Sequence, residues 1–141
     1  MTEYRKVFVD TAPLIYLLED NQVYYSRIEK LFSYWYKTGS HLITSAITVE
    51  EYCVYPYKQG RADLIENFDL FLSAYGIDVY RIDTEIAKKA AIIRSQFTAF
   101  KAMDALQLST AVINRCDCFL TNDKQLSQYR EIDCLVVNDL V

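Results

Sequence analysis

The sequence predicts an α/β fold in which a mainly parallel central sheet is flanked by helices. Short apolar runs alternate along the chain with longer segments whose apolar residues recur at helical spacing. Parallel strands need long crossover connections, and the intervals between these apolar runs are long enough to hold helices. At 141 residues the chain is near the commonest size of one domain, so we expect residues 1–141 to form a single domain.

The first part of the chain predicts one strand and two helices. Residues 6–10 form a short apolar run that predicts a strand. A helix is expected over 12–19, because Pro13 suits the first turn of a helix. A second helix is expected over 22–37, closed by Gly39.

The middle of the chain repeats this order. A strand is expected over 41–46, followed by a helix over 49–57 that ends near Pro56. The apolar stripe of 62–75 predicts another helix, which stops before Gly76.

The last part of the chain predicts three strands and two helices. Residues 77–82 form a strand, and Asp83 is expected to cap a helix that runs to about residue 97. Asp104 stands where the next helix is expected to begin, and the final strands are expected over 118–121 and 134–138.

Composition limits the classes of function. With 52% hydrophobic and 24% charged residues the chain is globular, and no apolar run approaches the roughly 20 residues that span a membrane. The four cysteines form no CxxC pair, which favours buried thiols in the reducing cytoplasm, where we expect the protein. A net charge of −4 provides no overall basic field, so a nucleic acid would have to be held by local cations or by metal ions.

Four acidic residues stand where ligands bind in open parallel sheets, beyond the carboxyl ends of the strands. Asp10 and Asp123 follow strands, Glu51 lies in the first turn of the helix after a strand, and Asp104 heads a helix. Four carboxylates at one edge would repel one another unless a cation lies between them. Their oxygen ligands favour Mg²⁺ or Mn²⁺ over zinc.

Each acid also has a purely structural interpretation. Asp10, Asp104 and Asp123 are each compatible with a helix N-cap. Thr48 and Glu51 match the spacing of a capping box, in which Glu51 would bind the Thr48 amide. The site interpretation is favoured because a single strand order brings all four acids together.

Four blocks, in order, resemble the signature blocks of PIN-domain nucleases, and most of all the VapC ribonuclease toxins of toxin–antitoxin pairs. The blocks are VFVDTAPLIYLLE at 7–19, TSAITVEEY at 44–52, MDALQLSTA at 103–111 and FLTNDKQL at 119–126. The resemblance implies a three-layer PIN-like sandwich and a metal-dependent endoribonuclease that hydrolyses RNA phosphodiester bonds.

It further implies that Asp10, Glu51, Asp104 and Asp123 form the catalytic site and hold one or two Mg²⁺ or Mn²⁺ ions. Glu51, rather than its neighbour, takes the glutamate position because Thr48 sets the register.

Several further residues are candidates for supporting roles. Thr11, Thr121 and Asn122 stand next to the predicted ligands, where they can hydrogen-bond to them or serve as turn and cap residues. Arg94 and Lys101 are candidate RNA contacts, although such charges are often only a solvated helix face.

Aromatic residues make up 14% of the chain, so we expect some of them to be exposed, where they are typical of protein interfaces. The family resemblance implies a cognate antitoxin and a homodimer. Two rival functions stay open at this point. One is a PIN-like module that binds RNA or protein without cleaving, and the other is a phosphatase or receiver-like domain.

Overall fold

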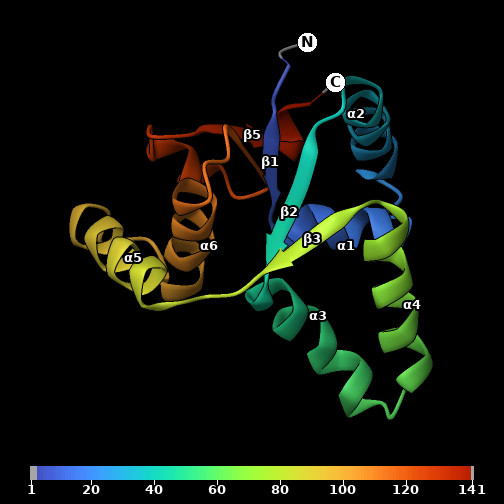
Figure 1. The fold of residues 1–141 in the computed structure, drawn as a ribbon. Coiled ribbons are helices and arrows are strands. Elements are labelled where there is room, and N and C mark those ends of the chain that lie inside the picture. The colour runs from blue at the N-terminus through green and yellow to red at the C-terminus, as the bar shows by residue number, and fades with distance from the viewer. Residues whose placement is uncertain (1–2, 141) are drawn as a thin grey trace.

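The computed structural model describes residues 3–140. Its core is a five-stranded sheet, which Figure 1 shows among the helices. The strand order is β3-β2-β1-β4-β5, and every neighbouring pair is parallel. The predicted α/β fold is therefore confirmed. The strands are β1 (Lys6–Val9), β2 (His41–Ser45), β3 (Ile77–Tyr80), β4 (Cys118–Thr121) and β5 (Asp133–Val136).

Helices connect the strands and cover both faces of the sheet (Figure 1). Two short 3₁₀ helices follow the last two strands. The helical elements are α1 (Thr11–Leu18), α2 (Tyr25–Thr38), α3 (Ala46–Lys58), α4 (Ala62–Ala74), α5 (Thr84–Gln96), α6 (Ala102–Ile113), η1 (Lys124–Gln128) and η2 (Val137–Asp139).

Two hydrophobic clusters make the three layers. Alternate residues of a strand point to opposite faces, so Val7 and Val9 of β1 join one cluster while Phe8 joins the other. Helices α1 to α4 pack in the first cluster, and α5 and α6 pack in the second. Because both faces are covered, the central strands are apolar at nearly every position, as a parallel sheet requires.

Some helix boundaries differ from those expected. The second helix starts at Tyr25 instead of 22, because the Asn21 side chain accepts hydrogen bonds from the Val23 and Tyr24 amides and holds a turn there. Helix α3 starts at Ala46, and Pro56 lies inside it instead of ending it. A proline so close to the helix end removes only one backbone hydrogen bond before the helix stops.

Two of the strands, β3 and β5, also end earlier than expected. The third strand ends at Tyr80, and the final one ends at Val136, after which the chain enters η2.

The order of the strands brings the ends of β1, β2 and β4 together. β1 lies between the other two, with Val9 beside Leu120 and Phe8 beside Ile43. The Asp10 amide continues the ladder by donating to the Leu120 carbonyl at 2.9 Å. The loops and helix starts that follow these three strands therefore share one edge of the sheet.

Among the described residues, no helix combines the length and the apolar character needed to cross a membrane.

Candidate metal centre

Asp10 is held in place at the centre of this edge. It follows β1 and caps α1, with its Oδ1 accepting from the Thr11 amide at 2.9 Å. Its Oδ2 accepts from the Thr121 hydroxyl, which lies at the end of β4, at 2.8 Å. Asp10 is therefore a helix N-cap, as the structural interpretation expected, and it also lies at the predicted site. Hydrogen bonds from α1 and from the end of β4 fix the orientation of its carboxylate.

Glu51 reaches the same place from the second turn of α3. The Thr11 hydroxyl donates to its Oε1 at 2.6 Å. The capping-box alternative is wrong, because Ser45 caps this helix and Thr48 lies within its first turn. With the helix start moved upstream, Glu51 points across to α1 instead of back to its own helix start.

Asp104 is the third residue of α6, since the N-cap position belongs to Lys101. The N-cap alternative for Asp104 is therefore wrong. A carboxylate in the first turn is still favoured by the helix dipole, because the free amides there carry partial positive charge. The half-buried Asp104 side chain thus lies at an amide-rich helix end.

Asp123 caps η1, as the structural interpretation expected. Its Oδ1 accepts from the Gln125 amide at 3.0 Å, and its own amide donates to the Thr121 hydroxyl at 3.0 Å. Thr121 therefore orders both the acid that follows β4 and the acid that follows β1.

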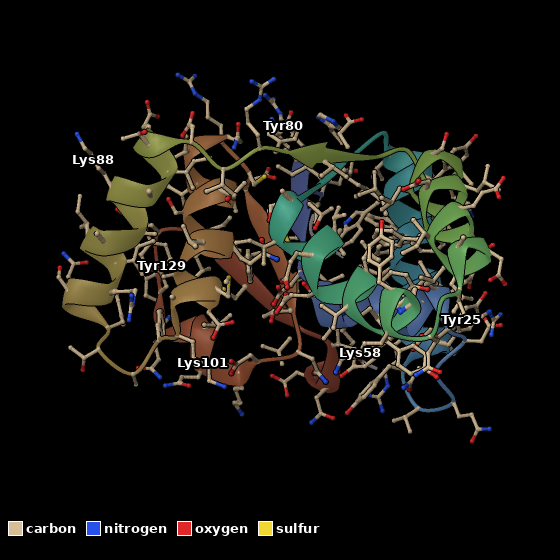
Figure 2. All side chains as sticks on the ribbon, turned by 90° about the horizontal axis from the view of Figure 1, so that it is seen from below. Tyr25, Lys58, Tyr80, Lys88, Lys101 and Tyr129 are labelled. Atoms are coloured by element: carbon tan, nitrogen blue, oxygen red, sulfur yellow. The ribbon has the colours of Figure 1, made fainter. Side chains whose placement is uncertain are left out.

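All four acids line one cavity of about 470 Å³. Figure 2 views the molecule from below, toward this edge of the sheet. The structure therefore brings together residues that are spread over more than a hundred positions of the chain. The lining consists of Asp10, Thr11, Ala12, Ile15, Tyr16, Glu51, Asp104, Thr121, Asn122 and Asp123.

Two of these acids, Asp10 and Asp104, have raised pKa values. Burial raises the pKa of Asp10 most, the hydrogen bonds from Thr121 and Thr11 oppose this shift, and the charges of Asp104 and Glu51 add to it. Together these effects bring the pKa from 3.8 to about 6. The pKa of Asp104 is also raised, first by burial and then by the Asp123 charge, while the Lys101 charge opposes the shift. Such a set of acids gains stability from a cation among them.

The donor set of the cavity fits a hard divalent cation. Its polar side chains offer carboxylate, hydroxyl and amide oxygens, the ligands that Mg²⁺ and Mn²⁺ prefer, and its lining contains neither His nor Cys. Within residues 3–140, no three acidic, His or Cys side chains converge closely enough to form a complete metal site.

The remaining predicted residues occupy different positions. Asn122 lines the cavity, but its amide donates to the Tyr16 hydroxyl at 3.2 Å and its Oδ1 accepts from the Asn138 amide at 2.9 Å. Lys101 is exposed at the start of α6, beside the cavity. Arg94 is exposed in the last turn of α5 and is not among the residues that line the cavity.

Sequence reasoning did not identify two residues of this region. Tyr16 forms part of the cavity wall and stacks on Tyr24, with ring centroids 4.7 Å apart. Gln107 is only 2% exposed and donates to the Thr48 hydroxyl at 2.9 Å. A signal for Gln107 was present in the sequence, because a glutamine among the apolar residues of α6, three positions after Asp104, is unusual in a buried helix face.

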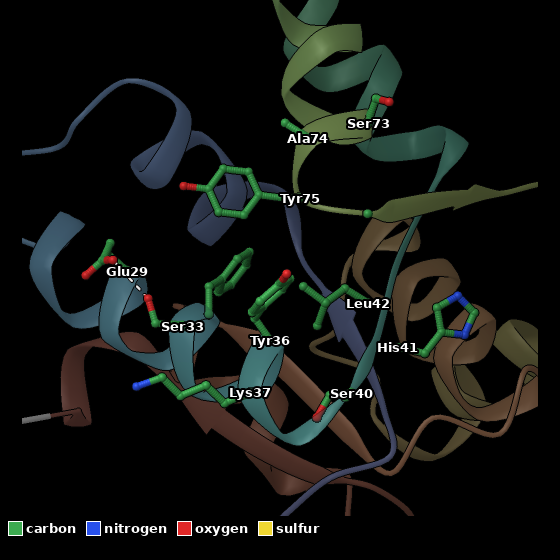
Figure 3. Close-up of a pocket in the computed structure, with 13 residues that line it drawn as sticks. Glu29, Ser33, Tyr36, Lys37, Ser40, His41, Leu42, Ser73, Ala74 and Tyr75 are labelled. Carbon is green, nitrogen blue, oxygen red and sulfur yellow. Dashed lines mark hydrogen bonds between the residues drawn. The ribbon is translucent and has the colours of Figure 1, made fainter.

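A larger cavity of about 690 Å³ lies elsewhere, where α2 ends and β2 begins (Figure 3). Its lining includes the aromatic residues Phe32, Tyr36 and Tyr75 among mostly small and polar residues, and Glu29 is the one carboxylate among the described residues that line it. His41 starts β2, as expected, and its Nε2 lies 2.6 Å from Asp78. This cavity has no group of acids, so the smaller cavity is the candidate centre.

In a comparison with protein-family models, residues 7–132 match the PIN domain. The chain belongs to the PIN-domain family. A sequence comparison with curated proteins finds no match.

Solved structures share the fold of this PIN domain at low sequence identity. A toxin–antitoxin complex from Klebsiella pneumoniae matches with a TM-score of 0.72 and 20% identity, over 93% of this chain and 97% of that one. VapBC2 from Rickettsia felis, bound to a promoter DNA fragment, matches with a TM-score of 0.73 and 15% identity, over 93% of this chain and 98% of that one. DNA-bound VapBC from Salmonella typhimurium matches with a TM-score of 0.67 and 18% identity, over 94% of this chain and 98% of that one. The predicted resemblance to VapC-like PIN domains is thus confirmed for the fold.

Proposed function

We propose that the chain is a single-domain, Mg²⁺- or Mn²⁺-dependent endoribonuclease that acts as the toxin of a toxin–antitoxin pair. The observation that carries this proposal is the single cavity lined by Asp10, Glu51, Asp104 and Asp123, in which burial and neighbouring charges raise the pKa of Asp10 to about 6. Acids of this kind at the carboxyl edge of a parallel sheet are suited to divalent-metal chemistry on phosphate esters.

The residues take different parts in the proposed reaction. Asp10 and Asp104 hold one or two ions, and Glu51 and Asp123 either complete the ligand set or orient the attacking water. A bound divalent ion supplies a Lewis acid that neutralises charge on the phosphoryl group and lowers the pKa of water. Thr11 and Thr121 keep two of the carboxylates aimed at the cavity through hydrogen bonds of 2.6 and 2.8 Å.

The ionisation of Asp10 suits this role. Donors on both of its oxygens lower its pKa, so that burial and the neighbouring acids raise it only to about 6. At neutral pH the carboxylate is therefore mostly ionised and able to bind a cation. Removing the donors would bring its pKa closer to neutrality.

The test is cleavage of a mixed pool of structured and single-stranded RNA by the purified protein with Mg²⁺, Mn²⁺ or EDTA. Asp10→Asn removes the central charge, and Asp69→Asn, at an exposed position of α4, is the matched control. We expect metal-dependent cutting that Asp10→Asn abolishes and Asp69→Asn retains. RNA binding without cutting would instead favour a non-cleaving PIN module. Hydrolysis of simple phosphomonoesters with no action on RNA would favour a phosphatase.

Partner proteins are a second part of the proposal. Several large apolar side chains on helices are exposed, including Tyr36 at 88%, Tyr55 at 63% and Tyr57 at 70%. Aromatic residues of this kind are typical anchors of protein interfaces. Together with the fold shared with chains of toxin–antitoxin complexes, they support an antitoxin partner and a homodimer. Light scattering of the protein alone, and with the product of a gene encoded beside it, measures both associations.

The thiols are consistent with the expected cytoplasmic location. The four cysteines are free, and burial raises the pKa of Cys116 to about 12, which keeps that thiol protonated.

A further inference from the structure

A buried glutamine lies beneath the acidic cavity. Gln107 is on α6, one helical turn after Asp104, and its side chain points into the interior and is 2% exposed. A buried amide must find hydrogen-bond partners, because leaving one unpaired costs stability. The partners of Gln107 are side chains that lead to the predicted metal ligands.

The orientation of the amide follows from Ser45. The Ser45 hydroxyl oxygen accepts from the Ile47 amide at 3.1 Å and donates its one proton to Gln107 Oε1. Gln107 Nε2 therefore faces the other way, toward the cavity, and has two protons to donate.

One branch from Nε2 leads to Glu51. Nε2 donates to the Thr48 hydroxyl at 2.9 Å. The Thr48 and Thr11 hydroxyl oxygens lie 3.1 Å apart, and Thr11 donates to Glu51 Oε1 at 2.6 Å. A second branch is direct but longer, with Nε2 3.4 Å from both Asp10 Oδ1 and the Thr11 hydroxyl oxygen. One amide thus contacts Asp10 directly and Glu51 through two hydroxyls.

We propose that Gln107 is a positioning residue that joins α6 to α1 and α3 and sets the spacing of Asp10, Glu51 and Asp104 for a divalent cation. This inference rests on the proposed metal-dependent function. Gln107 does not line the cavity, so it acts through Asp10, Thr11 and Thr48 instead of touching the ion or the RNA.

The placement of Gln107 supports a role beyond filling the core. Its neighbours on the buried face of α6 include Ala105, Leu108 and Ala111, all fully buried and apolar. A leucine would fill the volume without the cost of burying an amide. The Nε2 contacts of Gln107 point toward the acids. Loss of an outer hydrogen-bond partner of this kind typically changes metal affinity or activity by about 10- to 100-fold.

The test compares Gln107→Met with Ser109→Ala. Methionine keeps the length and removes every hydrogen bond. Ser109 is a buried polar residue of the same helix, and its hydroxyl donates to the Ile86 carbonyl at 2.6 Å, away from the acids. Mn²⁺ dissociation constants are measured by the electron paramagnetic resonance signal of free Mn²⁺, at a temperature where circular dichroism shows each variant folded. RNA cleavage at saturating Mn²⁺ is measured on the same samples.

We expect Gln107→Met to weaken Mn²⁺ binding by about 10-fold or more and to lower kcat, while Ser109→Ala keeps the wild-type affinity. If wild type binds Mn²⁺ and cleaves RNA but both variants keep its affinity and kcat, Gln107 has only a packing role and the inference is overturned. If wild type neither binds Mn²⁺ nor cleaves, the proposed function fails, and this inference fails with it.

A second variant covers the case in which Gln107→Met does not fold. Thr48→Val keeps the shape of a fully buried side chain and breaks the same chain of hydroxyls between Gln107 and Thr11. A loss of Mn²⁺ affinity in Thr48→Val supports the inference. Unchanged affinity overturns the part of it that runs through Thr48 to Glu51, because the direct contacts of Gln107 with Asp10 and Thr11 remain.

Discussion

The hydroxyl of Thr121 donates to Oδ2 of Asp10 at 2.8 Å, across the ends of the two neighbouring strands β4 and β1. These two residues are 111 positions apart in the chain. The bond fixes the central acid of the cavity, and the same hydroxyl accepts from the Asp123 amide. One threonine therefore connects two of the four acids through the sheet edge.

The first prediction concerns this threonine. Thr121→Val removes the donor that lowers the pKa of Asp10, so this pKa should rise above its present value of about 6. The variant also leaves a buried acceptor without its partner, which should cost about 1 to 3 kcal/mol of unfolding free energy. Titration of the Asp10 carboxyl by carbon NMR measures the pKa. Thr121→Ser, which keeps the hydroxyl, should resemble wild type, and an unshifted pKa in Thr121→Val would contradict the assignment.

The second prediction concerns the stability of the metal-free protein as pH changes. The pKa of Asp10 is higher in the folded chain, at about 6, than its ordinary value of 3.8. The folded state therefore binds more protons between these values, and the contribution of Asp10 to stability is present below about pH 4 and lost as pH rises through 6. The asparagine of Asp10→Asn does not ionise, so this variant does not lose that stability as pH rises. Its stability relative to wild type should increase by about 2 kcal/mol between pH 4 and pH 7.

Urea denaturation in EDTA at a series of pH values measures this difference. Asp69→Asn, at an exposed position, is the control for removal of one negative charge. Parallel stability curves for wild type and Asp10→Asn would show that the Asp10 carboxyl is not held at the expected pKa.

The third prediction is that Mn²⁺ stabilises the wild type and does not stabilise variants that lack Asp10 or Asp104. A cation that binds only the folded state at 100 times its dissociation constant adds about 2.7 kcal/mol. For a domain of this size the melting temperature should rise by roughly 5 to 10 °C. We expect this rise in wild type and in Asp69→Asn, and its loss in Asp10→Asn and Asp104→Asn. An equal rise in all four proteins would place the ion outside the cavity.

The fourth prediction concerns RNA contacts. Lys101 starts α6 beside the cavity, whereas Arg94 lies on the neighbouring helix α5. If each residue contacts a phosphate, Lys101→Ala and Arg94→Ala should each reduce the slope of log affinity against log salt by about 0.7 to 1. Lys37→Ala, in the other cavity, is the control for loss of a surface charge. An unchanged slope removes the residue in question from the proposed contacts.

Local patterns in the sequence were sufficient for the order of the elements and for the candidate acids. The apolar run of β1 is followed at once by Asp10, and the run of β4 is followed two residues later by Asp123. Because parallel strands place their carboxyl ends at one edge, this local information already implied that the acids meet. All four candidates line the same cavity.

Helix starts depended on contacts that the local sequence does not specify. Thr48 and Ser45 both suit an N-cap, and Ser45 takes that position in α3. Lys101, which is not a favoured capping residue, precedes α6, and Asp104 lies inside it. Capping preferences differ by only about 1 kcal/mol, so packing against the sheet can outweigh them.

The tertiary structure alone showed which polar groups hold the acids. Thr121 binds Asp10 over 111 residues, and Gln107 binds Ser45 over 62. A hydrogen bond of this kind exists only after the strands pair and α6 packs on the sheet, and no residue pattern within either segment encodes it. The order of strands and helices is a local property of the chain, because side-chain periodicity sets it. The spacing and ionisation of the acids are long-range properties, because burial and partners from distant segments set them.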